Sequence, residues 1–175
     1  SPKVFAQTRV GYTSIACGPA NKVLIAYQDV TNSNYGTAVD GDTSTAGSIM
    51  FGNPVVFRSS HIEYIAATYD SLTGKFVIAY TDNGNSYYGT VSTVTIVQDS
   101  ISFDYHEVVR DGASQYLTST YDSAAKKTVI SSRYYPPSAS GATYLSSNYG
   151  ADADKINVFA GTAITATELN IKDLV

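Results

Sequence analysis

The chain has one cysteine, Cys17, so it cannot form an intramolecular disulfide. Nothing therefore indicates a small secreted scaffold held by disulfides, and a single thiol says little about the redox compartment. Cys17 stands in the apolar stretch TSIACG. We expect it to be a small buried hydrophobic side chain.

Long hydrophobic runs and excess positive charge are also missing. No apolar run reaches the roughly 18 residues that a membrane-spanning helix needs, and the N-terminal stretch SPKVFAQTRVGYT lacks the apolar core of a signal peptide. The 11 Lys and Arg residues are outnumbered by 15 Asp and Glu residues, which gives a formal net charge of −4. Phosphate-binding surfaces need clustered basic side chains, so we expect neither a nucleic acid nor a membrane as a partner.

Recognisable catalytic and metal-binding motifs are absent as well. The two histidines, His61 and His106, have no Cys or second His at ligand spacing, and we expect them on the surface or in turns rather than on a metal. No Gly-x-Ser-x-Gly, His-Glu-x-x-His or phosphate-binding glycine loop occurs, and no nucleophile has an evident base. The sequence predicts a protein that is not an enzyme and has no cofactor. A glycosidase would need paired carboxylates, and Asp29 and Asp82 are the pair related by the repeat described below that we would test.

The residues that are abundant favour β-structure. The chain has 15 tyrosines and no tryptophan, only 15% of its residues are charged, and Ser, Thr, Asn and Gly fill much of the remainder. Aromatic and β-branched side chains suit a pleated, half-buried surface. A C-terminal stretch, TATELNIKDLV, is the one place where a helical turn or two is expected.

An internal repeat organises the chain. NKVLIAYQDVTNSNYG at 21–36 recurs as GKFVIAYTDNGNSYYG at 74–89, and extending the alignment gives three copies at 1–52, 53–104 and 105–156. Tyr12, Tyr64 and Tyr116 lie 52 residues apart. The third copy is the most degraded, because VISSRYYPPSASG replaces VIAYTDNGNSYYG.

Each copy contains four short segments of strand character separated by turn residues. In the second copy these segments are PVVFRS (54–59), EYIAATYD (63–70), KFVIAYTD (75–82) and GTVSTVTIV (89–97), the last leading into SISFD (100–104). The nearly continuous apolar runs KVLIAY and KFVIAY are typical of strands covered on both faces, whereas SISFD alternates and predicts a strand with one wet side.

The predicted fold is all-β: three four-stranded antiparallel repeats of about 52 residues that resemble β-propeller blades. Closed propellers typically have about four to eight blades, so either another chain completes the ring or the repeats close as a trefoil-like barrel or a β-sandwich. We expect one domain over 1–156. The tail at 157–175 would supply a closing strand or a docking arm.

The turns carry the candidate ligand-binding residues. They combine carboxylate, amide and phenol groups, which suit the hydroxyls and the apolar face of a sugar: Asp29, Asn34, Tyr35, Asp82, Asn85, Tyr87 and Tyr88. Asn, Asp and Gly are also the usual residues of hairpin turns, so a structural role is the favoured interpretation. DGDTST at 40–45 has the alternating acidic start of a calcium loop but lacks its later glycine and acidic residue, and it predicts a surface turn.

The repeat resembles one found in predicted virion and tail-associated proteins of marine phages, especially those that infect cyanobacteria. The pattern is carried by TYDSLTGKFVIAYTDNGNSYYGT (68–90), IMFGNPVVF (49–57) and KVLIAYQDVTNSNYGTAV (22–39). The resemblance implies a non-enzymatic protein displayed on the phage particle, such as a capsid decoration or knob protein or a fibre component. It implies other virion proteins or further copies of the chain as partners, with a host surface glycan as an additional candidate. The third copy departs from the pattern, which suggests a terminal repeat adapted to cap or dock.

Overall fold

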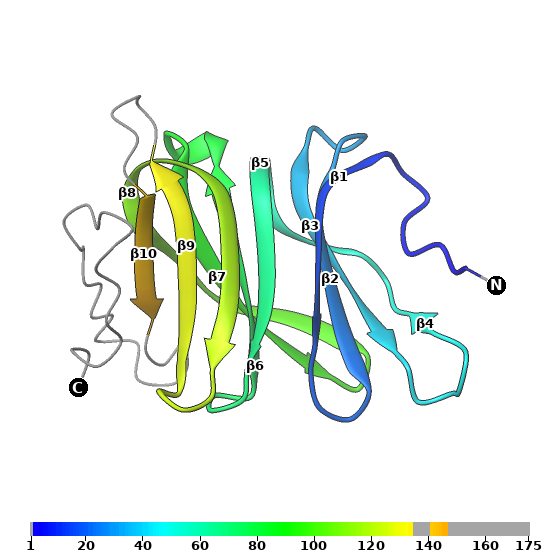
Figure 1. Cartoon of the computed structure of the whole chain (residues 1–175). Helices are drawn as coiled ribbons and strands as arrows, with labels where there is room; N and C mark the ends of the chain where they lie inside the picture. The colour runs from blue at the N-terminus through cyan, green and yellow to red at the C-terminus, as the bar shows by residue number, and fades with distance from the viewer. Residues whose placement is uncertain (1, 135–140, 147–175) are drawn as a thin grey trace.

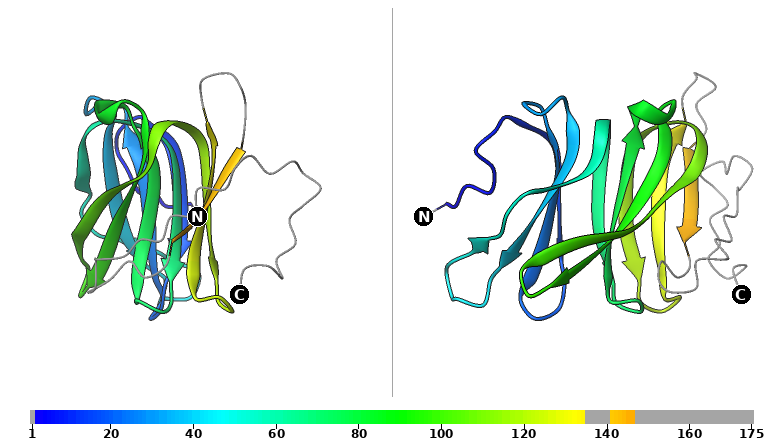
Figure 2. Two further views of the ribbon diagram at one scale, coloured as in Figure 1. Left: turned by 90° about the vertical axis from the view of Figure 1, so that its left-hand side faces the viewer. Right: turned by 180° about the vertical axis from the view of Figure 1, so that it is seen from behind.

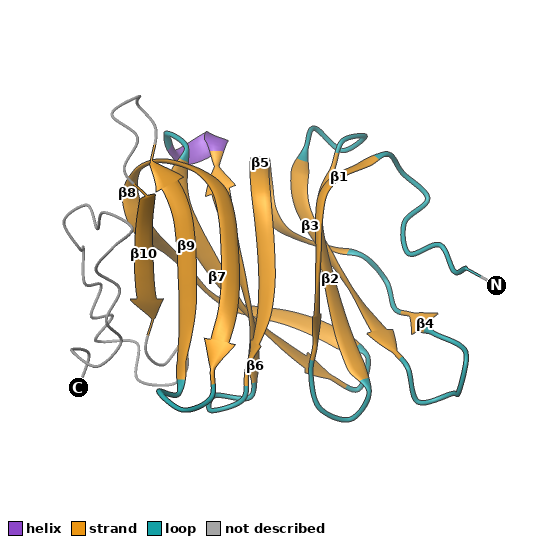
Figure 3. Ribbon diagram, in the orientation of Figure 1, coloured by secondary structure: helices purple, strands orange, loops and turns teal. Residues whose placement is uncertain are grey.

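The computed structural model describes residues 2–134 and 141–146. They form ten strands and one short 3-10 helix (Figures 1 and 3), so the prediction of an all-β, antiparallel fold is confirmed. The elements are β1 (Val10–Cys17), β2 (Lys22–Asp29), β3 (Tyr35–Asp42), β4 (Met50–Phe51), β5 (Val55–Asp70), β6 (Lys75–Asp82), η1 (Asn83–Asn85), β7 (Tyr88–Val97), β8 (Ser100–Asp122), β9 (Lys127–Tyr134) and β10 (Gly141–Ser146).

The strands pair in chain order. The path of hydrogen-bonded neighbours runs β1-β2-β3-β5-β6-β7-β8-β9-β10, and β4 pairs with the end of β3. Among the described residues this path is open, with β1 and β10 at its two ends and on opposite sides of the molecule in Figure 1. The trefoil-like barrel considered from the sequence is therefore wrong for this part of the chain. The predicted tail at 157–175, with TATELNIKDLV, lies outside the described residues.

Two long strands change partner along their length. Residues 55–61 of β5 pair with β3, and residues 62–70 pair with β6. In the same way β8 pairs first with β7 and then with β9, and it crosses the molecule diagonally in Figure 2. The sequence predicted two separate strands at 54–59 and 63–70. They merge because residues 55–69 contain no Gly, Pro, Asn or Asp that would turn the chain.

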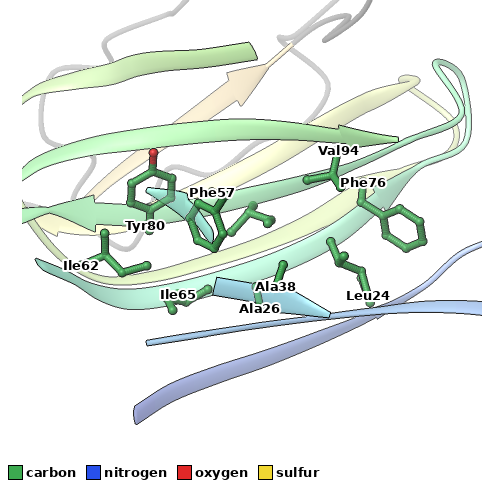
Figure 4. Close-up of a cluster of buried hydrophobic side chains, with 11 residues drawn as sticks. Leu24, Ala26, Ala38, Phe57, Ile62, Ile65, Phe76, Tyr80 and Val94 are labelled. Atoms are coloured by element: carbon green, nitrogen blue, oxygen red, sulfur yellow. The ribbon is translucent and has the colours of Figure 1, made fainter. Parts of the chain in front are cut away.

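Hydrophobic clusters lie between successive parts of this folded sheet. The largest brings side chains of β2 and β3 against those of β5, β6 and β7 (Figure 4); its members include Leu24, Ala26, Ala38, Phe57, Ile62, Phe76, Ile78 and Tyr80. A second cluster joins β6 and β7 to β8 and β9 through Val77, Ala79, Val91, Leu117 and Ile130. Alternate residues of β6 thus contribute to different clusters, as its continuous apolar run predicted.

Strand SISFD also behaves as predicted. Ile101 and Phe103 pack against the largest cluster, while the alternating residues Ser100, Ser102 and Asp104 are exposed. The alternation of apolar and polar residues therefore marks a strand with one wet face.

Three smaller expectations are wrong or incomplete. Cys17 is exposed rather than buried, because it ends β1, an edge strand on which Ile15 is also exposed. His61 and His106 lie within β5 and β8 rather than in turns. Both reach the surface as expected, because the side chain of His61 is 42% exposed and His106 is exposed. Asp40 and Asp42 end strand β3, and only the residues after them form the predicted loop.

Candidate functional site

The predicted candidate residues lie in two separate turns at one end of the strands (Figure 3). Asp29 ends β2, and Asn34 and Tyr35 lead into β3. Asp82 ends β6, Asn85 belongs to η1, and Tyr87 and Tyr88 lead into β7. The structure thus groups these residues by turn.

Asp29 holds the first turn through its side chain. Its Oδ1 accepts hydrogen bonds from the backbone N–H groups of Thr31, at 3.1 Å, and Asn32, at 3.2 Å. Ser33 and Asn34 both have a positive φ, of 54° and 61°. A left-handed pair of this kind reverses the chain tightly between antiparallel strands. The carboxylate therefore acts within its own turn.

Asp82 is buried and has a fuller set of partners. Only 1% of the residue is exposed, and its Oδ2 lies 2.6 Å from Nη2 of Arg58. Its Oδ1 accepts hydrogen bonds from Oγ of Ser60, at 2.7 Å, and from the backbone N–H of Gly84, at 3.1 Å. Buried carboxylates need such compensation. Arg58 ties the turn to the neighbouring strand β5.

Tyr87 lines a pocket of about 220 Å³, whose exposed lining is mainly apolar. Its other lining residues come from β5, β6 and β8: Glu63, Thr81, Ala113, Ser114 and Gln115. The backbone N–H of Ser114 donates to the carbonyl oxygen of Tyr87 at 2.9 Å, which fixes the turn against β8. We call this hollow the Glu63 pocket. It presents a carboxylate, an amide and a phenol together.

Asp29 lines a different hollow, of about 400 Å³, between β2 and the N-terminal segment. Its aromatic residues are Phe5, Tyr27 and Phe51, and Phe5 lies edge-on to both of the others. Asp29 and Asp82, the repeat-related carboxylates that a glycosidase would pair, therefore face different surroundings.

Three tyrosines form a row, and two of them, Tyr64 and Tyr116, directly follow the pocket residues Glu63 and Gln115 in the sequence. The ring centroids of Tyr12 and Tyr64 are 5.1 Å apart, and those of Tyr64 and Tyr116 are 4.8 Å apart. All three residues have a positive φ, between 45° and 52°, and each lies at a register shift of its strand. Arg133 places its guanidinium carbon 6.0 Å from the ring centroid of Tyr116 and extends the row. We call these three residues the tyrosine row.

The tyrosine row is partly open to solvent. Tyr12 is 42% exposed and Tyr116 is 60% exposed, whereas Tyr64 between them is half-buried. Partial burial, with the neighbouring phenols of Tyr12 and Tyr116, raises the pKa of Tyr64 to about 12. Tyr64 therefore stays uncharged at neutral pH, and the row offers an aromatic surface.

A second polar group of side chains joins the exposed His106 to the buried Tyr80 and Ser92. Nδ1 of His106 is 2.6 Å from Oγ of Ser92 and 3.3 Å from Oη of Tyr80. Burial and the nearby Arg58 lower the pKa of His106, while burial raises the pKa of Tyr80 to about 12. At neutral pH these groups are hydrogen-bonding partners without charge.

No family model matches the chain, and a search of curated proteins finds no match. Over residues 2–134 and 141–146, no helix has the length and apolar character needed to span a membrane. Across the same stretches, no three His, Cys, Asp or Glu side chains gather as potential metal ligands.

Proposed function

We propose that the chain is a non-enzymatic structural protein displayed on a phage particle, as a capsid decoration or knob protein or a fibre component. The support comes from the resemblance of its repeat to those of virion and tail-associated phage proteins. The buried carboxylate of Asp82 pairs with Arg58 and accepts hydrogen bonds from Ser60 and Gly84, which agrees with a structural role for this residue.

We also propose that the three copies are blade-like units that stack on one another. The observation that carries this part is the tyrosine row, to which each copy contributes the residue at its equivalent position. Strands β5 and β8 support it, because each pairs first with a strand of one copy and then with a strand of the next, without a turn. β5 passes from β3 to β6, and β8 passes from β7 to β9. Units that bury faces against their neighbours are the principle of repeat architectures.

Association with particles tests the functional proposal. Particles of the phage that encodes the chain would be purified on a density gradient, and their proteins quantified by mass spectrometry. We expect the chain to band with the major capsid protein, whereas a replication protein from the same lysate is lost. A chain that remains entirely in the soluble fraction contradicts the proposal.

The Glu63 pocket favours carbohydrate binding as a second candidate function. A carboxylate and an amide from Glu63 and Gln115 can hydrogen-bond to sugar hydroxyls, and the half-exposed ring of Tyr87 can lie against an apolar sugar face. Its size suits one sugar residue better than a long oligosaccharide. A host surface glycan is the class of ligand that this chemistry fits.

A glycan array followed by titration tests this candidate. We expect saturable binding that Tyr87→Ala and Glu63→Gln each weaken by at least about tenfold, which corresponds to about 1.4 kcal/mol. The control is Tyr35→Ala, which removes a tyrosine from the end of the turn between β2 and β3, outside the pocket. This variant should bind as the parent does. Failure to bind any glycan, or equal binding by all variants, would exclude the pocket as a sugar site.

A further inference from the structure

The N-terminal segment corresponds in sequence to two strand segments. Aligned by the 52-residue spacing, residues 3–9 match residues 55–61 and 107–113. Those two segments pair with β3 and β7. Residues 3–9 are not in a strand and have no ladder partner within the described residues. Residues 3–9 therefore have the sequence of a strand segment, but no neighbouring strand pairs with them.

The same segment already makes the side-chain contact of its counterpart. Phe57 packs on Tyr80 with ring centroids 5.3 Å apart and an interplanar angle of 62°. Phe5 packs on Tyr27, the equivalent tyrosine, at 5.5 Å and 64°. Residues 3–9 thus contact β2 through Phe5 much as residues 55–61 contact β6 through Phe57. What residues 3–9 lack is the backbone partner that β3 supplies to residues 55–61.

Strand β10 has the complementary property. It occupies the place in the third copy that β3 and β7 occupy in the first two, since Gly36, Gly89 and Gly141 align. Whereas β3 and β7 each pair on both sides, β10 pairs only with β9 among residues 2–134 and 141–146. Unpaired strand edges readily accept another strand.

Within one chain these two elements are far apart. The N-terminal segment and β10 lie at opposite sides of the molecule in Figure 1, and the reversed view in Figure 2 agrees. Val4, within the segment, is 67% exposed, and Met50, which precedes the Phe51 that Phe5 contacts, is 70% exposed. Exposed apolar side chains on an unpaired segment and beside it are a feature of interfaces between chains.

We propose that residues 3–9 of one copy pair with β10 of a second copy, head to tail. The known pairs Gly36 with Arg58 and Thr37 with Val56 have equivalents in Gly89 with Arg110 and Thr90 with Val108. The same register places Gly141 opposite Ala6, Ala142 opposite Val4, and Thr143 opposite Lys3 in the partner copy. An interface of this kind joins different surfaces of the two copies, so it generates a ring or an open array. It does not depend on the phage assignment.

Cysteine cross-linking between two different variants tests this register. One protein carries Val4→Cys, the other carries Ala142→Cys with a size tag, and both carry Cys17→Ser because Cys17 is exposed. After mixing and oxidation with diamide, we expect a disulfide-linked heterodimer on a non-reducing gel. Opposed residues of paired strands lie within the roughly 7 Å that a disulfide spans.

The matched control replaces Ala142→Cys with Ser146→Cys. This position is four residues further along the same strand, about 13 Å away, so its yield of heterodimer should be at least about tenfold lower. If Ala142→Cys fails to fold, as judged by circular dichroism, Lys3→Cys with Thr143→Cys tests the same register. Equal yields for matched and displaced pairs overturn the proposal.

Two other products would also overturn it. Dimers formed by the Val4→Cys protein alone, in equal amount to the heterodimer, would indicate a symmetric contact between N-terminal segments. A chain carrying both cysteines that cross-links only within itself would indicate that one copy closes on its own β10. Either result, or any failure of the cross-linking, leaves the particle-association experiment unaffected.

Discussion

At the scale of single residues, the turn between β8 and β9 contains a strained position. Lys126 has a φ of 55°, and its equivalent in the turn between β5 and β6 is Gly74, with a φ of 72°. A left-handed conformation costs an L-residue about 1–2 kcal/mol, whereas the extra chain entropy of glycine costs about 0.5–1 kcal/mol. The strain that a glycine would relieve at this position therefore exceeds the entropy that it would cost.

Lys126→Gly should accordingly raise the free energy of unfolding by about 0.5–1 kcal/mol. Urea denaturation of the parent and the variant measures the difference. Lys127→Gly, one residue further and at the first position of β9, should instead destabilise the protein by about 0.5–1 kcal/mol, because it removes a side chain from a regular strand. Equal effects at both positions would contradict this account.

Asp82 should contribute far more to stability than Asp29. Asp82→Asn keeps the shape but removes the charge that faces Arg58, and it turns one acceptor oxygen into a donor. Since Arg58 is about one-third exposed, water compensates part of the loss. We expect a loss of about 2–3 kcal/mol in the free energy of unfolding.

Asp29→Asn is the matched comparison. The side chain keeps an acceptor oxygen for the N–H groups of Thr31 and Asn32, and the residue is not fully buried, so we expect a loss below about 1 kcal/mol. Both losses come from the same denaturation experiment. A larger loss at Asp29 would mean that the buried ion pair is not what holds the second turn.

The types of residue in the sequence predicted where the turns lie, but they did not predict which residues line the Glu63 pocket. Asp29 and Asp82 were recognisable as turn residues because Asp, Asn and Gly recur there in two copies. Arg58, Glu63 and Gln115 gave no such signal, since each lies within a long strand and meets its partners only through pairing with distant segments. The spacing of 52 residues identified the members of the tyrosine row, but not that their rings would meet.

At the scale of elements, the tyrosine row links β1, β5 and β8. Tyr64 contacts both Tyr12 and Tyr116, and no ring contact joins Tyr12 to Tyr116 among the described pairs. Aromatic pairs contribute about 0.5–1.5 kcal/mol beyond the burial of their area. The coupling between strands should therefore pass through Tyr64.

Double-mutant cycles with leucine test this coupling. We expect an interaction energy of about 0.5–1.5 kcal/mol for Tyr12 with Tyr64, and a similar value for Tyr64 with Tyr116. The cycle of Tyr12 with Tyr116 should give a value near zero and serves as the control. Equal coupling in all three cycles would show that the effect arises from general loosening of the sheets rather than from ring contacts.

The strands themselves were largely readable from the sequence. KFVIAYTD at 75–82 coincides with β6, because an apolar run bounded by TGK and NGN marks both of its ends. The merging of two predicted strands into β5 was missed. Which partner a strand takes depends on long-range pairing, and a bulge at a tyrosine with positive φ leaves no local mark in the sequence.

At the scale of the whole molecule, burial is greatest in the middle of the sheet order. Phe76, Ile78 and Tyr80 of β6 belong to one hydrophobic cluster, and Val77 and Ala79 belong to the other. Strand β1 has the opposite environment, since it is an edge strand with Tyr12, Ile15 and Cys17 exposed. Amide protection follows local packing and hydrogen bonding.

Hydrogen–deuterium exchange followed by mass spectrometry should therefore rank these strands. We expect peptides from β6 to exchange most slowly, at a rate set by global unfolding, and peptides from β1 to exchange at least about tenfold faster through local opening. Urea below the unfolding midpoint is the control, because it accelerates global unfolding and should bring the two rates together. If β1 already matches β6 without urea, the two strands unfold as one cooperative unit, and the edge strand has no independent opening.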